Sequence, residues 1–157
     1  MSADTWLPEM AKVNPWTDRT LEYLYAIFLE DIKHFPLQYA GYDVWFFSDM
    51  EDGKEVLFWH LTSREDKETK ERIPDMRRSE RLPWVNPCIE NYSDSDLLCW
   101  DYEEGNRTIK TYVWLKDKDF VVIMKKYKNN SRRLVTSFFI DYESKRKNLA
   151  MKYKNRI

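Results

Sequence analysis

Apolar side chains recur at three- and four-residue steps through the first third of the chain. The residues in this pattern are Leu21, Leu24, Tyr25, Phe28 and Ile32. They share one face if residues 20–35 form a helix. Thr17 and Asp18 offer an N-cap, and Pro36 ends the pattern. The sequence therefore predicts an N-terminal helix with one buried side.

Apolar and β-branched runs indicate strands in the rest of the chain. Residues 42–47 and 55–61 flank a turn at 49–53, which predicts a hairpin. Residues 108–115, 119–127 and 133–140 alternate and are joined by short polar turns, which predict a three-stranded antiparallel meander. We expect this meander to be continuous.

The remaining segments have weaker patterns. Residues 1–16 hold Pro8 and Pro15 and should be irregular, residues 64–80 should be a solvated charged segment, and only a short helix fits near Ile89. The acidic run 94–104 is interpreted as a connection. Asp141 can cap a last helix with Leu149 on its buried side. The expected fold is α+β, one domain over 1–157 with a globular part at 17–154 and helices packed on one face of the sheet.

Composition supports a folded domain with an uneven charge distribution. Hydrophobic residues make up 43% of the 157 residues and aromatic residues 16%, which excludes a disordered chain. Residues 105–157 hold fifteen of the 26 basic residues and only four of the 27 acidic ones. This asymmetry favours an anionic partner for the basic part, or mutual neutralisation of the two parts within the fold.

Several classes of site and location do not fit the sequence. With three glycines there is no glycine-rich phosphate loop, and with two histidines and two cysteines no zinc quartet can be written, so we expect no metal and no cofactor. The polar N-terminus lacks a signal peptide, and the apolar run at 23–29 is too short for a bilayer. These features predict a cytoplasmic protein without membrane contact, or a toxin module released from a larger exporter.

His60 is the first candidate for chemistry, because histidine exchanges protons near neutral pH. If residues 55–62 are a strand, His60 and Thr62 point to the same face, where the imidazole could act as a general base or acid. A plain surface or core histidine is the alternative. That alternative suits His34, which follows a predicted helix end.

Arg77, Arg78 and Arg81 form a second candidate group. If this segment is helical, the four-residue step from Arg77 and the three-residue step from Arg78 both place Arg81 on the same face as the earlier arginine. Such a cluster can hold a phosphate and stabilise the charge of its transition state. Ion pairs with Asp75, with Glu80 or with the acidic run after Asp94 are the competing interpretation.

The last predicted strand carries two hydroxyl groups. Strict alternation places Thr136 with Leu134, and Ser137 with Arg133. One hydroxyl could therefore donate to a phosphate on the concave face. The alternative is that threonine occurs here only because it has a high propensity for strands. Lys125 and Tyr127 could line the same surface.

Three pieces of the sequence together resemble a known family. They are residues 58–63, residues 77–84 with Ile89 and Glu90, and residues 133–140. The second piece contains an Arg-x-x-Arg-Leu-Pro-Trp motif. These pieces are similar to the barnase/EndoU/colicin/RelE-like ribonuclease superfamily, particularly its phage-associated and toxin–antitoxin members. The resemblance covers roughly residues 17–150.

The resemblance implies metal-independent cleavage of RNA by attack of the 2′-hydroxyl, giving a 2′,3′-cyclic phosphate. His60 would be the general base or acid, Arg78 and Arg81 would hold the scissile phosphate, and Thr136 would donate a hydrogen bond. The neighbouring residues Thr62, Arg77, Lys125, Arg133 and Ser137 would contact the substrate. The motif lacks the acidic residue of barnase-like members, which leaves Lys125, Tyr112 or Tyr142 as the second proton-transfer group.

The sequence predicts a small ribonuclease toxin held inert by a protein antitoxin or immunity partner. Two other functions remain open. One is a nucleic-acid-binding module without catalysis, which would use the basic half. The other is an immunity or antitoxin protein whose acidic half mimics nucleic acid.

Overall fold

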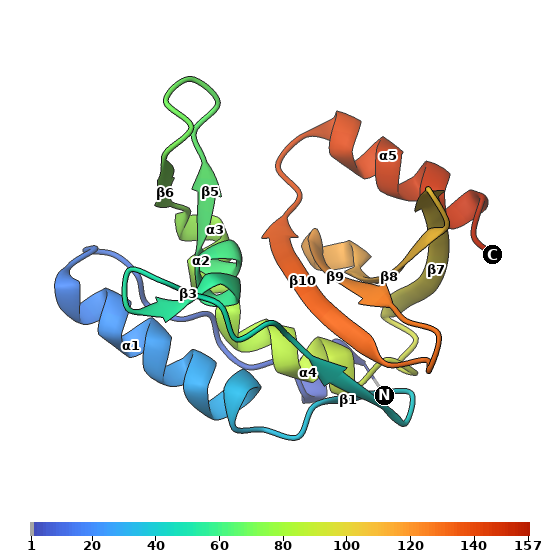
Figure 1. The fold of residues 1–157 in the computed structure, drawn as a ribbon, viewed down its shortest axis with the longest axis horizontal. Coiled ribbons are helices and arrows are strands. Elements are labelled where there is room, and N and C mark those ends of the chain that lie inside the picture. Colours follow the sequence, from blue (N-terminus) through green and yellow to red (C-terminus); the bar gives the residue numbers. More distant parts are fainter. Residues whose placement is uncertain (1) are drawn as a thin grey trace.

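The computed structural model describes residues 2–157 and has an α+β fold (Figure 1). The elements in chain order are η1 (Ala3–Thr5), α1 (Asp18–Phe28), η2 (Leu29–Lys33), β1 (Gln38–Tyr39), β2 (Tyr42–Trp45), β3 (Met50–Glu51), β4 (Lys54–Glu55), α2 (Val56–Thr62), β5 (Ser63–Glu65), β6 (Arg72–Pro74), α3 (Met76–Glu80), η3 (Leu82–Trp84), α4 (Val85–Glu90), β7 (Leu97–Gly105), β8 (Thr108–Leu115), η4 (Lys116–Lys118), β9 (Phe120–Lys126), β10 (Arg132–Phe139) and α5 (Glu143–Lys154). The predicted N-terminal and C-terminal helices are both present.

A curled six-stranded sheet forms the centre of the molecule, in the order β1-β2-β10-β9-β8-β7. Strands β8, β9 and β10 pair antiparallel, so the predicted meander is confirmed. β2 joins β10 in parallel, through only two residue pairs at the start of β10. The rest of β10 has no strand on that side, and α2 and α3 lie along it instead. This free edge of β10 brings helical residues close to a strand.

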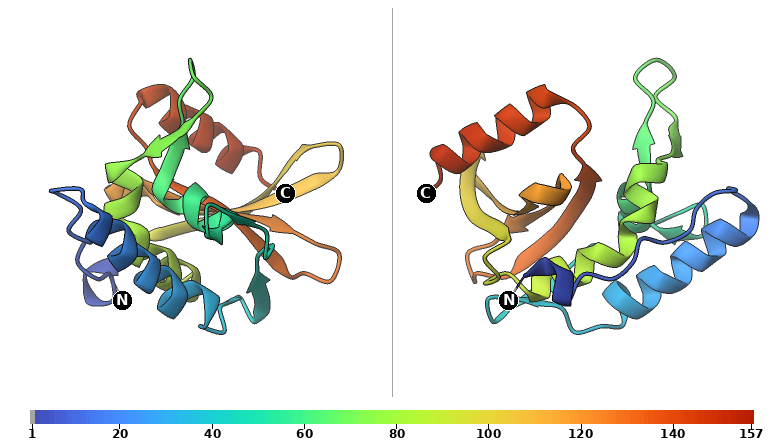
Figure 2. Two further views of the ribbon diagram at one scale, coloured as in Figure 1. Left: turned by 60° about the vertical axis from the view of Figure 1, so that its left-hand side comes forward. Right: turned by 180° about the vertical axis from the view of Figure 1, so that it is seen from behind.

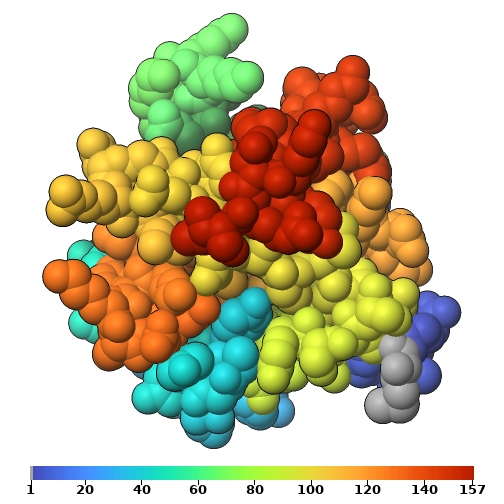
Figure 3. Space-filling view, turned by 90° about the vertical axis from the view of Figure 1, so that its right-hand side faces the viewer, coloured from blue at the N-terminus to red at the C-terminus, as the bar shows by residue number. Residues whose placement is uncertain are grey.

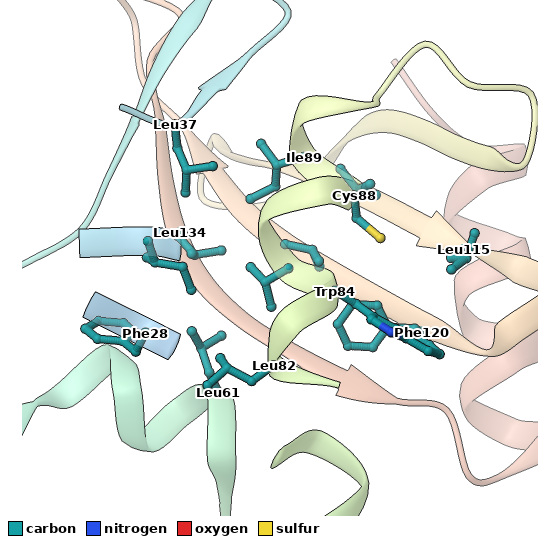
Figure 4. Packing of buried hydrophobic residues seen from close by; sticks show 14 of the residues in the cluster. Phe28, Leu37, Leu61, Leu82, Trp84, Cys88, Ile89, Leu115, Phe120 and Leu134 are labelled. Carbon is teal, nitrogen blue, oxygen red and sulfur yellow. The ribbon is translucent and has the colours of Figure 1, made fainter. Parts of the chain in front are cut away.

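Helices cover both faces of the sheet. Residues from α1, α2 and α4 fill a large core against one face, where Phe28, Leu61 and Leu134 point toward one another (Figure 4). The expectation that helices pack on one face is correct for these three. The exception is α5, which packs Leu149 on the opposite face against a smaller cluster that includes Trp100. Figure 3 shows this side, with α5 crossing the surface in red.

The predicted hairpin of residues 42–47 and 55–61 does not form, because the second segment is the helix α2. Within α2, Leu57, Phe58 and Leu61 are all buried, a helical spacing that alternation cannot produce. The prediction of a strand at 55–61 was wrong because a short apolar run fits a buried helix and a strand equally well.

The acidic run 94–104 was also misread, because most of it is strand β7 rather than a connection. Its acidic residues share the strand with Leu97 and Trp100, which are both buried.

The charged segment 64–80 also forms regular structure. Strands β5 and β6 form a hairpin that projects from the body of the molecule (Figure 2). Residues 2–16 are irregular apart from η1, as expected, although Ala11 and Val13 are buried.

Candidate active site

A β-bulge in β10 decides which side chains share a face. Leu134 pairs with Met124, and the next paired residue is Thr136, so Val135 is an extra residue. Because a bulge reverses the alternation beyond it, Arg133 and Thr136 lie on the same face. Ser137 instead faces the large core with Leu134. The assignment from strict alternation, which grouped Ser137 with Arg133, is therefore wrong.

His60 lies in the last turn of α2, beside the free edge of β10. Its carbonyl oxygen accepts a hydrogen bond from Thr136 Oγ1 at 3.2 Å. The same oxygen accepts a hydrogen bond from Arg78 Nη1 at 2.9 Å, and Arg78 Nη1 also donates to the Ser63 carbonyl at 3.1 Å. These contacts join α2, α3 and β10 at one point.

Arg78 is held by α3, whose N-cap Asp75 accepts from the Arg78 backbone N–H at 3.1 Å. The Asp75 carboxylate also lies 3.4 Å from Arg78 Nε, so Arg78 forms one of the ion pairs that the competing interpretation expected. Arg78 Nη1 lies 3.5 Å from Thr136 Oγ1 as well, but with two hydrogens it can satisfy only the two closer carbonyls. Among residues 2–157 no partner contacts Nη2, and the guanidinium lies 5.7 Å from the centre of the Phe138 ring. The Nη2 side of this guanidinium is therefore the side at which a ligand could bind.

The His60 side chain lines a hollow of about 210 Å³. The hollow is formed by Phe46, Phe47, Asp49, Val56, Leu57, His60, Arg133, Leu134 and Val135. Within the described chain neither ring nitrogen has a hydrogen-bond partner. Burial, with the positive charges of Arg72 and Arg78, lowers the pKa of His60. The imidazole is therefore neutral at pH 7 and can accept a proton.

The other two arginines of the predicted cluster are Arg77, which precedes Arg78 in α3, and Arg81, which directly follows α3. Arg81 is buried, donates to the Arg77 carbonyl and to Glu80, and stacks 4.3 Å from the centre of the Phe139 ring. Arg77 is exposed and also lies over Phe139. Arg81 has the structural contacts that the competing interpretation expected, so the structure does not join it to the His60 contacts.

Two predicted substrate contacts are buried. Thr62 donates to the Phe58 carbonyl inside α2, and its side chain does not share a strand face with His60, because the segment is helical. The Ser137 side chain is fully buried, and its Oγ has no hydrogen-bond partner among residues 2–157. As they stand in the fold, neither hydroxyl reaches an accessible surface.

The remaining predicted contacts, Lys125 and Arg133, lie opposite one another on β9 and β10. Arg133 Nε donates to the Tyr127 hydroxyl at 3.0 Å, and the Lys125 ammonium lies 5.2 Å from the Tyr127 ring centre. Arg133 also stacks on Phe47 at 4.4 Å. Phe47 was not predicted as a site residue, and it is exposed although it belongs to an apolar run. The run ends in three consecutive aromatic residues, Trp45, Phe46 and Phe47, which is the signal that could have indicated it.

Asp49 is a second residue that sequence analysis missed. It supplies a carboxylate to the hollow that His60 lines. Of the predicted candidates for the second proton transfer, Tyr112 is buried and donates to Glu104, and both burial and this carboxylate raise its pKa. Tyr142 is 63% exposed, beside Lys145. Tyr142 is accessible but lies at the N-terminus of α5, whereas Asp49 lines the hollow and Lys125 is paired with Arg133, which lines it too. We therefore retain Lys125 and Asp49 as candidates.

A larger hollow of about 470 Å³ lies beside the β5–β6 hairpin. Glu51, Asp52 and Glu71 offset Lys70 and Arg72 on its walls, so it does not favour an anion. Residues 2–157 hold no cluster of three or more histidine, cysteine or acidic side chains suited to a metal ion. No helix in this range is long and apolar enough to cross a bilayer.

Comparison of the chain with protein-family models, with curated proteins and with solved structures gave no match.

Proposed function

We propose that this protein cleaves RNA where α2, α3 and β10 meet. His60 would take the proton from a ribose 2′-hydroxyl, and the free side of Arg78 with Thr136 would face the scissile phosphate. Arg133, in the same hollow as His60, would add positive charge. Arg81 has no part in this proposal, because Glu80 and Phe139 occupy its guanidinium.

The observation that carries the proposal is the contact between residues far apart in the chain. Arg78 and Thr136 come from two different elements, and both donate to the backbone carbonyl of His60 in a third. The His60 imidazole shares its hollow with Arg133 and with one carboxylate, Asp49, and it is close enough to Arg78 for that charge to lower its pKa. Proton transfer and stabilisation of phosphate charge need these groups.

The proposed step keeps all atoms and charges in balance. The 2′-oxygen loses its proton to His60 and forms a bond to phosphorus, and the bond from phosphorus to the 5′-oxygen breaks. The leaving 5′-oxygen takes a proton from a second group, for which Lys125 and Asp49 are the candidates. The products are a 2′,3′-cyclic phosphate and a 5′-hydroxyl.

The chain offers a matched control for His60, because His34 is its only other histidine and is exposed. We expect His60→Gln to slow cleavage of single-stranded RNA in EDTA by about 10²–10⁴-fold, the usual contribution of general acid–base catalysis. His34→Gln should cleave like the wild type. Equal rates for the two variants, or intact RNA after long incubation with the wild type, would refute the proposal.

Binding of RNA without cleavage is the second candidate. One observation favours it: both good hydrogen bonds of Arg78 Nη1 go to backbone carbonyls, so this nitrogen serves the fold. A pure binder would retain RNA affinity in both histidine variants and leave RNA intact.

A toxin role, with a protein antitoxin as partner, follows from the same proposal. Expression of the wild type alone in growing cells should then arrest growth, and expression of His60→Gln should not. Growth arrest by both variants to the same degree would separate toxicity from cleavage.

A further inference from the structure

Three cations lie side by side across the sheet, and in residues 2–157 none of them is within ion-pair distance of a carboxylate, although the charge of Lys110 reaches Glu104. Lys110, Lys125 and Arg133 occupy directly paired positions on β8, β9 and β10, and Trp45 of β2 pairs next to Arg133. Like charges directly opposite each other destabilise a sheet. Within residues 2–157 no carboxylate forms an ion pair with any of the three.

The neighbouring cations on the opposite face differ. Lys126 and Arg132 follow and precede Lys125 and Arg133, and both pair with Asp101, at 3.3 and 3.6 Å. Arg132 is also bonded to Thr111 and buried. Asp101 therefore pairs with the cations on one face, whereas on the other face only Lys110 has a carboxylate nearby within the described chain, that of Glu104. An anion could bridge Lys125 and Arg133 and extend to Lys110.

Aromatic rings flank the unpaired cations. Trp45 lies 5.1 Å from Tyr127 and 5.5 Å from Phe47, between ring centres, and Arg133 contacts both Tyr127 and Phe47. The Phe47 side chain is 51% exposed. We call this group the aromatic–basic surface: Trp45, Phe47, Lys110, Lys125, Tyr127 and Arg133. Cations that track a phosphate backbone beside rings that stack on bases are how proteins hold single strands.

We propose that the aromatic–basic surface binds the nucleotides of single-stranded RNA next to the cleavage point. This inference rests on the proposed function for the location of the cut, because Arg133 also lines the hollow of His60. From β8 to β2 the surface crosses three strand spacings, about 14 Å. At about 3.4 Å for each stacked nucleotide, it would cover about four nucleotides.

The test uses 2′-O-methyl oligonucleotides, which cannot be cleaved by 2′-hydroxyl attack, so binding is measured apart from catalysis. The affinity of the wild type for these oligonucleotides should rise with oligonucleotide length up to about four nucleotides and then level off. Single-stranded oligonucleotides should bind more tightly than duplexes. In the triple variant Lys110→Gln, Lys125→Gln and Arg133→Gln, affinity should fall by about tenfold or more, and the salt slope by about 2. The control replaces three exposed, unpaired lysines elsewhere, Lys12, Lys118 and Lys147, with glutamine.

A second pair of variants tests stacking. Phe47→Ala should weaken binding by about 5- to 100-fold, and Tyr23→Ala, which removes a ring of equal exposure from α1, should not. If the triple variant and its control bind equally, or if duplexes bind as tightly as single strands, the inference is wrong. If wild-type binding behaves as stated but RNA is never cut, the inference holds and the proposed cleavage fails.

Discussion

Arg78 is predicted to hold α2 against β10, and its removal gives the sharpest test of how the site is assembled. In Arg78→Ala the carbonyls of His60 and Ser63 each lose one of two donors, because Thr136 still donates to the first and Arg72 to the second. A hydrogen bond from a charged group contributes about 1.5–3 kcal/mol to stability. Two such bonds give at most about 6 kcal/mol, and water can replace part of them, because the Arg78 side chain is 19% exposed. We expect the free energy of unfolding to fall by about 2–4 kcal/mol.

The adjacent Arg77 provides the control for this prediction. It lies in the same helix and carries the same charge, but its guanidinium makes only a ring contact with Phe139. Arg77→Ala should therefore cost no more than about 1 kcal/mol. Urea unfolding followed by tryptophan fluorescence measures both variants, because the chain has seven tryptophans. Equal losses for the two variants would refute the role given to Arg78.

Two further predictions concern buried groups. Ser137→Ala should raise stability by about 1 kcal/mol, because it removes a buried hydroxyl without a partner, and should leave RNA cleavage unchanged; a clear loss of stability in urea unfolding would contradict this. His60 should weaken the fold at acid pH. Since burial and nearby arginines lower its pKa in the folded state, the unfolded chain takes up the proton first as the pH falls below about 6.5, and stability is lost. His60→Gln should lose less stability than the wild type between neutral and acid pH, and an equal loss would count against the assigned shift. For the same reason, the acid limb of the cleavage profile should lie below about pH 6.5.

The meander could be predicted from the sequence because each of its strands alternates and its turns are short. Helix α2 could not, since Leu57, Phe58 and Leu61 form a run that is apolar on several sides. Periodicity carries no information when nearly every position of a short segment is apolar. Tertiary packing beside β10 decided that this segment is helical.

The site was only partly predictable for a related reason. His60, Arg78 and Thr136 were selected together through a resemblance of motifs, and the fold brings Arg78 and Thr136 into contact with the backbone carbonyl of His60. The bulge at Val135, by contrast, has no signature in the residues, yet it decides that Thr136 and not Ser137 faces the same side as Arg133. The role of Phe47 depends on the parallel pairing of β2 with β10, which joins segments about 90 residues apart.

Cleavage at a single ribonucleotide within an otherwise deoxyribonucleotide strand tests the central claim most directly. If His60 removes the proton of a 2′-hydroxyl, the wild type in EDTA should cut only on the 3′ side of that ribonucleotide. The fragments should carry a 2′,3′-cyclic phosphate and a 5′-hydroxyl, and His60→Gln should produce them about 10²–10⁴-fold more slowly. Cuts within the deoxyribonucleotide parts, fragments with 5′-phosphates, or equal cutting by wild type and His60→Gln would contradict the account.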